Sequence, residues 1–225
     1  MTTGQTHNEA QPLPQDEDLI FQHAYKACGF DLNIGMFSFA KMGVGSVVWD
    51  AAVALMKYFE EQNASFLGKK VIEMGSGTGA LGILTVLLGG DVTITDKSEL
   101  LEQMEWNVSV NIPSCCRSRI RVRALSWGYD QTLFPSDYDY ILCADIMYSY
   151  ESVPLILKTL LHLSNENTII YFASTMSICQ TMIITGYQYL SRHFNTKLVY
   201  QNKVKDVHVY MMTKIIISDV VEAEP

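Results

Sequence analysis

Hydrophobic positions follow two different periods in alternation through the middle of the chain. Amphipathic stretches carry apolar residues three and four apart, which is the spacing of one helix face. They predict helices at 45–62, 79–88, 98–110, 152–163 and 178–193. Short, mostly apolar runs lie between them and are typical of buried strands. These runs predict strands at 69–74, 91–96, 120–125, 138–144 and 167–173. Alternation of this kind predicts βαβ units around a parallel sheet.

The end of the chain follows another pattern. The apolar stretches 195–201 and 206–217 lie close together, which predicts a hairpin and hence an antiparallel edge on the parallel sheet. The predicted fold class is α/β, with roughly seven strands and helices on both faces. Polar composition predicts a disordered tail at 1–18 and an acidic tail at 218–225, which leaves 19–217 as a single domain.

Composition narrows the class of protein. The formal net charge of −8 argues against broad binding to nucleic acid, which requires a basic surface. Four arginines alternate along one predicted strand, and the ordinary interpretation is a solvated strand face: Arg117, Arg119, Arg121 and Arg123. The five cysteines show neither a disulfide framework nor metal-ligand spacing, which is typical of a reducing compartment. No signal peptide or membrane span is evident. We therefore expect a cytoplasmic protein.

The most informative motif joins the first predicted strand to its helix. Residues 71–79 read V-I-E-M-G-S-G-T-G, and such glycines let the backbone approach a ligand closely. The spacing fits both G-x-G-x-G and G-x-G-x-x-G, the second through Gly77, Gly79 and Gly82. Asp96 ends the next strand, where a carboxylate would accept hydrogen bonds from a ribose; the alternative is an N-cap. The motif predicts a nucleoside-containing cofactor and leaves its kind open.

Glu73 favours one kind of cofactor. A carboxylate just before the glycine loop would repel a pyrophosphate, whereas it would tolerate the sulfonium and amino-acid head of S-adenosylmethionine. The alternative is a salt-bridged residue at a strand end. Two tryptophans have similar alternatives, since an aromatic in an amphipathic helix is usually part of the core. From the residues alone, Trp49 favours the core, and Trp127, just past a strand end, is either core or a lid over a ring.

A second group of residues follows the buried strand 138–144. Asp145 leaves this strand and must be paired or face a cleft, because an isolated buried carboxylate is costly. Tyr148 lies three residues further on and can turn back beside it. The alternative is that Asp145 caps the following turn. From the residues alone, a carboxylate that faces a cleft and a carboxylate that caps the turn both stay open.

These motifs jointly resemble the seven-strand S-adenosylmethionine-dependent protein methyltransferases with a D-x-x-Y motif, family sixteen. The similarity runs over about 20–215 and is carried by segments 47–52, 71–79, 90–96, 123–128 and 144–148. It is strongest to the branch that methylates lysines on chaperones and translation factors. Details around 58–63, 68–73 and 126–128 are most similar to the enzymes that act on elongation factor 1-alpha.

The resemblance implies a Rossmann-like methyltransferase domain with S-adenosyl-L-methionine as cofactor. It implies that the cofactor contacts Trp49, Glu73, Gly75, Ser76, Gly77, Asp96, Trp127 and Ala144. It places Asp145 and Tyr148 at the substrate lysine, on elongation factor 1-alpha or on a heat-shock or AAA-type chaperone. We expect a monomer without metal. Cys143 departs from the glycine common at this position in relatives, and 173–177 lacks the expected basic residues.

Three alternatives belong to other classes. The glycine fingerprint is also compatible with an NAD-dependent oxidoreductase. A methyltransferase acting on RNA or small molecules would share the cofactor site. A non-catalytic chaperone-binding protein would use the cofactor only structurally.

Overall fold

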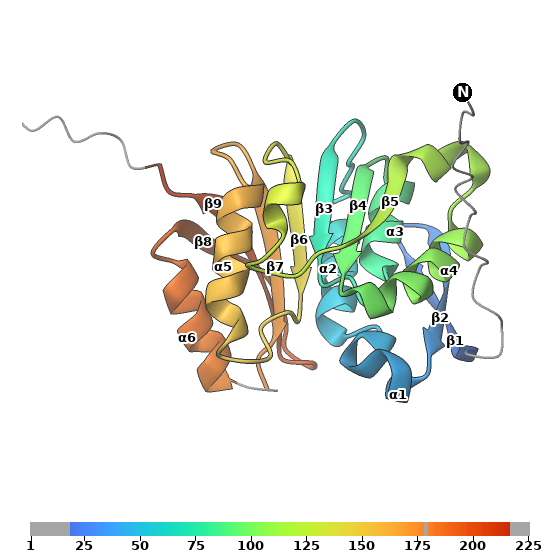
Figure 1. Cartoon of the computed structure of the whole chain (residues 1–225), viewed down its shortest axis with the longest axis horizontal. Coiled ribbons are helices and arrows are strands. Elements are labelled where there is room, and N and C mark those ends of the chain that lie inside the picture. The colour runs from blue at the N-terminus through green and yellow to red at the C-terminus, as the bar shows by residue number, and fades with distance from the viewer. Residues whose placement is uncertain (1–18, 178–179, 217–225) are drawn as a thin grey trace, which may run out of the picture.

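A seven-stranded sheet forms the centre of the protein (Figure 1). The computed structural model describes residues 19–177 and 180–216, so the predicted tails at 1–18 and 218–225 lie outside the described residues. The strands are β3 (Lys70–Met74), β4 (Asp91–Asp96), β5 (Ile120–Ala124), β6 (Tyr140–Ala144), β7 (Ile169–Thr175), β8 (Phe194–Asn202) and β9 (Val207–Lys214). Their order in the sheet is β5-β4-β3-β6-β7-β9-β8.

The strand directions confirm the predicted sheet. Strands β3 to β7 pair in parallel, and β9 pairs antiparallel with both β7 and β8. Parallel strands buried on both faces read as nearly continuous apolar runs, which is why they were recognisable in the sequence. The predicted C-terminal hairpin is β8–β9.

Helices cover both faces of the sheet. One apolar core contains buried residues of α2 (Asp50–Glu61), α3 (Ala80–Leu87) and α4 (Leu101–Asn111). A second contains those of α5 (Ser152–Leu163) and α6 (Gln180–Leu190). Neighbouring strand residues alternate between the two cores, Val71 in the first and Ile72 in the second, as the pleat requires. No helix in the described ranges is long and apolar enough to cross a membrane.

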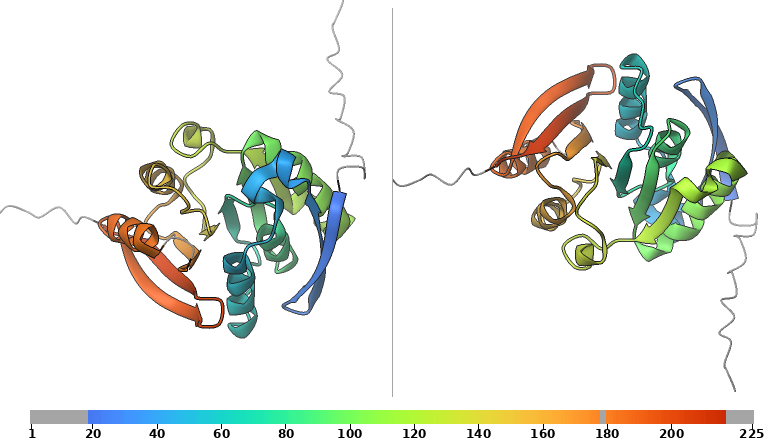
Figure 2. Two further views of the ribbon diagram at one scale, coloured as in Figure 1. Left: turned by 90° about the horizontal axis from the view of Figure 1, so that it is seen from below. Right: turned by 90° about the horizontal axis from the view of Figure 1, so that it is seen from above.

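An N-terminal hairpin was absent from the sequence-based prediction. Strands β1 (Leu19–Ala27) and β2 (Phe30–Phe37) pair antiparallel as a separate two-stranded sheet. The hairpin packs on the outer side of α4 and α3, away from the central sheet (Figure 2). Polar residues interrupt the apolar ones in β1, so the hydrophobic pattern there gives little indication of a strand.

The predicted helix at 45–62 was too long at its start. Residues before it form the short helices α1 (Phe39–Met42) and η2 (Gly43–Ser46), and α2 begins only at Asp50. The reason is local, because Trp49 has the extended backbone of an N-cap position, with φ −82° and ψ 154°. Ser98 does not cap α4 as predicted, because η3 (Ser98–Leu100) begins at Ser98 and precedes α4. The Ser98 hydroxyl donates to the Glu99 carboxylate instead.

The four arginines do not share one strand face. Arg117 and Arg119 lie in η4 (Ser114–Arg119), before β5 begins. Arg119 donates to the carbonyls of Val86 and Gly90, and Arg121 pairs with Asp91. Arg117 lies 3.9 Å from the Glu105 carboxylate, and the Arg123 guanidinium lies 4.2 Å above the Phe134 ring. All four arginines therefore have contacts within the fold, and they do not form the solvated strand face that was predicted.

The strand order creates a crevice at one edge of the sheet. The chain runs outward through β3, β4 and β5 and then returns to place β6 beside β3. Loops after β3 and β6 therefore leave in opposite directions, and ligands of open α/β sheets bind at such a switch point. The carboxyl ends of these strands are the lower edge in Figure 1.

The contact of α3 with β4 requires glycine at position 82. A Cβ added there would lie 2.1 Å from Ile94 Cγ2 and 2.7 Å from Glu73 Oε2. Alanine favours a helix by about 1 kcal/mol over glycine, but overpacking costs about 1–3 kcal/mol. We therefore expect Gly82→Ala to lower the free energy of unfolding, measured by urea denaturation. Gly186→Ala in α6, where the neighbour is the flexible Met147 side chain, should cost less; equal or greater stability of Gly82→Ala would contradict this packing.

Candidate active site

A cavity of about 670 Å³ opens at the carboxyl ends of β3 and β6. All the residues predicted for the site line it: Trp49, Glu73, Gly75, Ser76, Gly77, Asp96, Trp127, Ala144, Asp145 and Tyr148. They come from the ends of four neighbouring strands and from the segment before α2. The volume is in the range of small-molecule and cofactor sites, about 300–1,000 Å³.

Left-handed backbone shapes the loop between β3 and α3. Gly75, Gly77 and Gly79 have φ values of 68°, 54° and 79°, which only glycine adopts readily. Ser76 lies between them and bonds Thr95 twice, through its own N–H at 2.9 Å and through its hydroxyl at 3.0 Å. The loop is therefore tied to the neighbouring strand β4 while Gly75 and Gly77 face the cavity.

The cavity wall leaves no room for a side chain at Gly75 or Gly77. A Cβ on Gly75 would lie 2.6 Å from Ile146 Cγ2 and 3.0 Å from the Trp127 ring. One on Gly77 would lie 3.1 Å from the Gly45 carbonyl oxygen. The loop thus lies in contact with Trp127 on one side and with the segment before α2 on the other.

Asp96 also organises the loop. Its carboxylate accepts from the Gly77 N–H and from the Lys97 N–H, each at 2.8 Å. Burial raises the pKa of Asp96, and these two bonds oppose the rise. The alternative of an N-cap is wrong, because Lys97 occupies the N-cap position of the following turn. One carboxylate oxygen therefore fixes the loop, and the group as a whole borders the cavity.

Glu73 is buried, with 3% of its surface exposed. Its Oε2 accepts from the Gly82 N–H at 2.9 Å, near the start of α3. Burial raises its pKa to about 8, although the bonds from Ser76 and Gly82 oppose this. The group is therefore mostly protonated at neutral pH. The sequence-based argument that a negative charge on Glu73 would repel a pyrophosphate thus no longer holds. The alternative of a salt-bridged residue is also wrong, because its partner is a backbone N–H.

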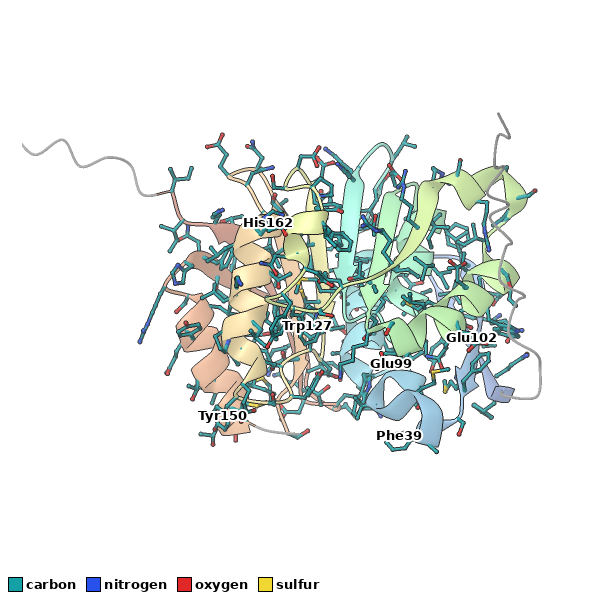
Figure 3. The ribbon with its side chains drawn as sticks, in the orientation of Figure 1. Phe39, Glu99, Glu102, Trp127, Tyr150 and His162 are labelled. Atoms are coloured by element: carbon teal, nitrogen blue, oxygen red, sulfur yellow. The ribbon has the colours of Figure 1, made fainter. Side chains whose placement is uncertain are left out.

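The two tryptophans occupy different parts of the cavity wall. Trp49 is 37% exposed and donates from Nε1 to the Val44 carbonyl at 2.8 Å, so the prediction of a core position is wrong. Trp127 is half-buried, and its Nε1 is buried without a hydrogen-bond partner. Figure 3 places Trp127 between the strands, toward their carboxyl ends. An unpartnered buried donor in a cavity wall is a group that a ligand can satisfy.

Asp145 adopts a left-handed backbone directly after β6, with φ 52°. Its N–H continues the pairing with β7 by donating to the Ala173 carbonyl at 3.0 Å. Its carboxylate accepts from the Thr175 N–H at 2.6 Å and from the Thr175 hydroxyl at 2.8 Å. Burial raises the pKa of Asp145, and the Thr175 bonds oppose it. The carboxylate is thus clamped to the next strand and does not cap the following turn.

Neighbouring positions complete this wall. Ala144 leaves space beside the loop, and Tyr148 is 48% exposed with its ring centroid 6.2 Å from that of Trp127. Cys143 is fully buried in the second core and does not line the cavity, so it does not crowd the strand end. Burial raises the pKa of its thiol well above the ordinary value.

Two parts of the site were missed in the sequence. Segment 40–49 contributes a whole side of the cavity, and Thr175 holds Asp145. The glycines at 43 and 45 were the only local signal for an irregular segment there. Thr175 could have been found from its place at the end of the strand after the one that carries Asp145. Among the described residues, no three His, Cys, Asp or Glu are grouped to hold a metal ion.

Solved structures identify the fold as that of the Rossmann-like methyltransferases. A TehB-like SAM-dependent methyltransferase from Corynebacterium glutamicum is 15% identical, with a TM-score of 0.55 over 79% of this chain and 92% of its own. The methyltransferase domain of bacterial CtHen1-C is 17% identical, with a TM-score of 0.54 over 72% of this chain and 96% of its own. At such identities the likeness concerns the fold alone.

Sequence comparison defines the family. The family model described as "Lysine methyltransferase" matches residues 32–184, and the chain belongs to this family. "EEF1A lysine methyltransferase 3" of Mus musculus is 42% identical over 93% of both chains, and that of Xenopus tropicalis is 41% identical over 91% of this chain and 93% of its own. "Protein N-lysine methyltransferase METTL21A" of Xenopus tropicalis is 41% identical over 76% of this chain and 78% of its own.

The protein is therefore a protein-lysine methyltransferase with S-adenosylmethionine as its cofactor. The cavity suits this molecule chemically. Glycine backbone forms one side, the Trp127 Nε1 offers a free donor, and the Asp96 carboxylate borders the cavity as a hydrogen-bond acceptor. The dinucleotide alternative left open by the glycine spacing is thereby removed.

The raised pKa of Glu73 has a measurable consequence. The unfolded protein loses this proton near pH 4.5, whereas the folded, ligand-free protein keeps it up to about pH 8. Its contribution to stability is therefore full below pH 4.5 and is lost as pH rises to 8, with a slope of up to about 1.4 kcal/mol per pH unit. Glu73→Gln should remove this loss, so that its stability relative to wild type increases between pH 5 and 8. If the free energy of unfolding, measured by urea denaturation, changes with pH equally in both proteins across this range, the raised pKa of Glu73 would be contradicted.

Proposed function

We propose that this enzyme methylates a lysine of elongation factor 1-alpha. Two relatives named for that activity match it over more than nine-tenths of both chains, and this similarity carries the choice of substrate. The geometry supports an amine acceptor, since Asp145 stands at the strand end opposite the glycine loop in the same cavity. We infer one methyltransferase domain over 19–217, acting as a cytoplasmic monomer without direct contact to nucleic acid.

Roles for the cavity residues follow from their chemistry. Gly75, Ser76 and Gly77 present the backbone on which the amino-acid head would lie. Asp96 would accept hydrogen bonds from the ribose, and Trp127 would donate from its unpartnered Nε1. In addition, Trp49, Glu73 and Ala144 would bound the cofactor from the remaining sides. When bound, S-adenosylmethionine supplies a methyl group already activated by the sulfonium.

Asp145 would bind and orient the incoming lysine. A free lysine has a pKa near 10.4, so only roughly one in a few thousand is neutral at pH 7. Thr175 holds the carboxylate in place, so it can align the ammonium without reorganising. The lysine ammonium would then lose its proton to water. The positive sulfonium of the cofactor favours this loss, because it disfavours another positive charge in the same cavity. Tyr148 would shape the channel through which the side chain enters.

The cavity mouth supports a folded protein as substrate. Tyr148 lines the cavity and is 48% exposed. Two further exposed aromatic residues lie close to lining residues in the chain: Phe39 (63%), next to Ala40, and Tyr150 (58%), two residues after Tyr148. Phe39 and Tyr150 lie along the same edge of the molecule as the strand ends (Figure 3). Exposed aromatic groups at a cavity rim are typical of protein-binding surfaces. The acidic net charge suits a basic partner.

A chaperone lysine is the second candidate substrate. It follows from the resemblance of the motifs to the branch that methylates chaperones, whereas the name of the METTL21A relatives specifies lysine methylation without a substrate. A direct comparison separates the two: purified enzyme and labelled S-adenosylmethionine are incubated with elongation factor 1-alpha, with heat-shock and AAA-type chaperones, and with RNA. Label on a chaperone or on RNA alone would overturn the proposal. The absence of transfer by an enzyme that binds the cofactor would favour a non-catalytic role.

Removal of the carboxylate should stop the reaction. We expect Asp145→Ala to reduce methyl transfer by at least 100-fold, roughly the 3 kcal/mol of a lost preorganised group. Cofactor affinity, measured by calorimetry, should stay within a few-fold. Thr175→Val keeps the carboxylate and loses one of its two bonds, so a smaller loss of about tenfold is expected. Full activity of Asp145→Ala would contradict the role of this residue.

Substitutions at the rim should affect substrate binding alone. We expect Phe39→Ser combined with Tyr150→Ser to raise the KM for folded elongation factor 1-alpha by about tenfold, since anchor residues contribute more than about 1 kcal/mol each. The cofactor Kd should not change. Leu67→Ser is the control, because Leu67 is 80% exposed and lies before β3, at the opposite edge of the sheet. Equal effects of both changes would show that the rim does not bind the substrate.

A further inference from the structure

We propose that Gln103 is a positioning residue that holds segment 38–49 over the cofactor cavity, and that hairpin β1–β2 is the anchor of this segment. The inference rests on the proposed function only in taking S-adenosylmethionine as the ligand of the cavity. It assigns a task to the hairpin, which lies outside the central sheet and contributes no residue to the cavity lining.

Three carboxamides of α4 bind the backbone of β2. Asn111 Oδ1 accepts from the Asn33 N–H at 2.7 Å, and its Nδ2 donates to the Asn33 carbonyl at 2.9 Å. Asn107 pairs with Gly35 in the same way, at 2.7 and 3.0 Å. Gln103 Oε1 accepts from the Phe37 N–H at 3.0 Å. We call this set the amide ladder; its members on α4 are Gln103, Asn107 and Asn111.

The ladder depends on a match between helix and strand dimensions. Residues four apart on a helix are separated by about 6 Å along its axis. Residues two apart on a strand are separated by about 6.6 Å. Every second residue of a strand directs its N–H and C=O to the same edge, so alternate residues of β2 can each meet one carboxamide. The side chains of α4 thereby take the place of a neighbouring strand along this edge of the hairpin.

Two of these amides also reach the glycine loop. Asn107 Nδ2 donates to the Thr78 carbonyl at 2.9 Å, and Gln103 differs in that its Nε2 reaches segment 38–49 as well. This Nε2 donates to the Gly45 carbonyl at 2.8 Å and to the Gly77 carbonyl at 3.3 Å. One fully buried side chain thus joins the end of β2, the middle of segment 38–49 and the glycine loop. A buried amide with every bond made is specific in direction, and its replacement leaves backbone groups unpaired.

Segment 38–49 forms a wall of the cavity beside the glycine loop, where Gly45 lies against Gly77. Its lining residues are Ala40, Met42, Gly43, Val44, Gly45, Val47, Val48 and Trp49. A Cβ added at Gly45 would lie 2.4 Å from a Leu100 methyl, so the segment lies closely against η3 as well. The segment consists of two short helices and an extended end, with little regular bonding to hold it. Its position over the loop therefore depends on side-chain bonds, of which those of Gln103 are central.

Two variants of Gln103 separate its functions. Gln103→Met keeps the length and loses every bond. Gln103→Glu keeps an acceptor for the Phe37 N–H and loses the donor to Gly45 and Gly77. We expect both to raise the Kd of S-adenosylmethionine at least tenfold, measured by calorimetry. The kcat at saturating cofactor should stay within about threefold of wild type. Exchange of amide hydrogens in 38–49 should become faster.

Asn111→Ser provides the matched control. It removes the bonds at the far end of the ladder, which touch neither the segment nor the loop. Its melting temperature should fall, while its cofactor Kd should stay within twofold of wild type. An unchanged Kd in Gln103→Glu, or an equal rise in Asn111→Ser, would overturn the positioning role. If wild type itself fails to bind S-adenosylmethionine, the proposed function fails instead, so the two outcomes are distinguishable. Should Gln103→Met not fold, Gln103→Glu and Asn111→Ser decide alone.

Discussion

The reversal of the chain between β3 and α3 is the constraint on which the rest of the structure depends. Within five residues the backbone must leave a buried strand, face the cavity and enter a helix, and three left-handed glycines make this possible. Groups from elsewhere then hold the loop: Asp96 bonds Gly77, Thr95 bonds Ser76, and Glu73 bonds Gly82. Each of these partners lies on β3 or β4, so the sheet itself sets the shape of the loop. The other walls of the cavity pack against this loop and depend on its position.

The side of the cavity formed by the end of β6 depends on a carboxylate that a neighbouring strand holds in place. Asp145 has the same left-handed conformation without being glycine, a state that costs of order 1 kcal/mol or more and is found where neighbours enforce it. Thr175, at the end of the next strand, enforces it by donating its N–H and its hydroxyl to the Asp145 carboxylate. The glycine loop, which we propose for the cofactor, and the clamped Asp145, which we propose for the amine, thus lie on the two sides of the switch point between β3 and β6. The sheet topology separates the two tasks onto different strands.

Regular periodicity made the sheet, most helices and the antiparallel hairpin predictable from the sequence. Most of the residues that line the cavity were predictable because they lie in or just after the ends of strands, where position in the chain translates directly into position in the fold. Segment 38–49 and hairpin β1–β2 were not, because their structure depends on contacts with α4 more than on their own pattern. The charge of Glu73 was misjudged for the same reason, since the pKa of a carboxyl reflects its burial and not its place in a motif. Trp49 was misplaced because the helix was drawn one turn too early.

The amide ladder also limits how this protein can change in length. One residue inserted in α4 would turn everything beyond it by about 100° around the helix axis. One residue inserted in β2 would direct its bonding groups to the wrong edge of the hairpin. Side chains on the outer faces of both elements are free to vary, but insertions and deletions between Gln103 and Asn111 or between Asn33 and Phe37 are not. Length variation among homologues should therefore gather outside these two spans.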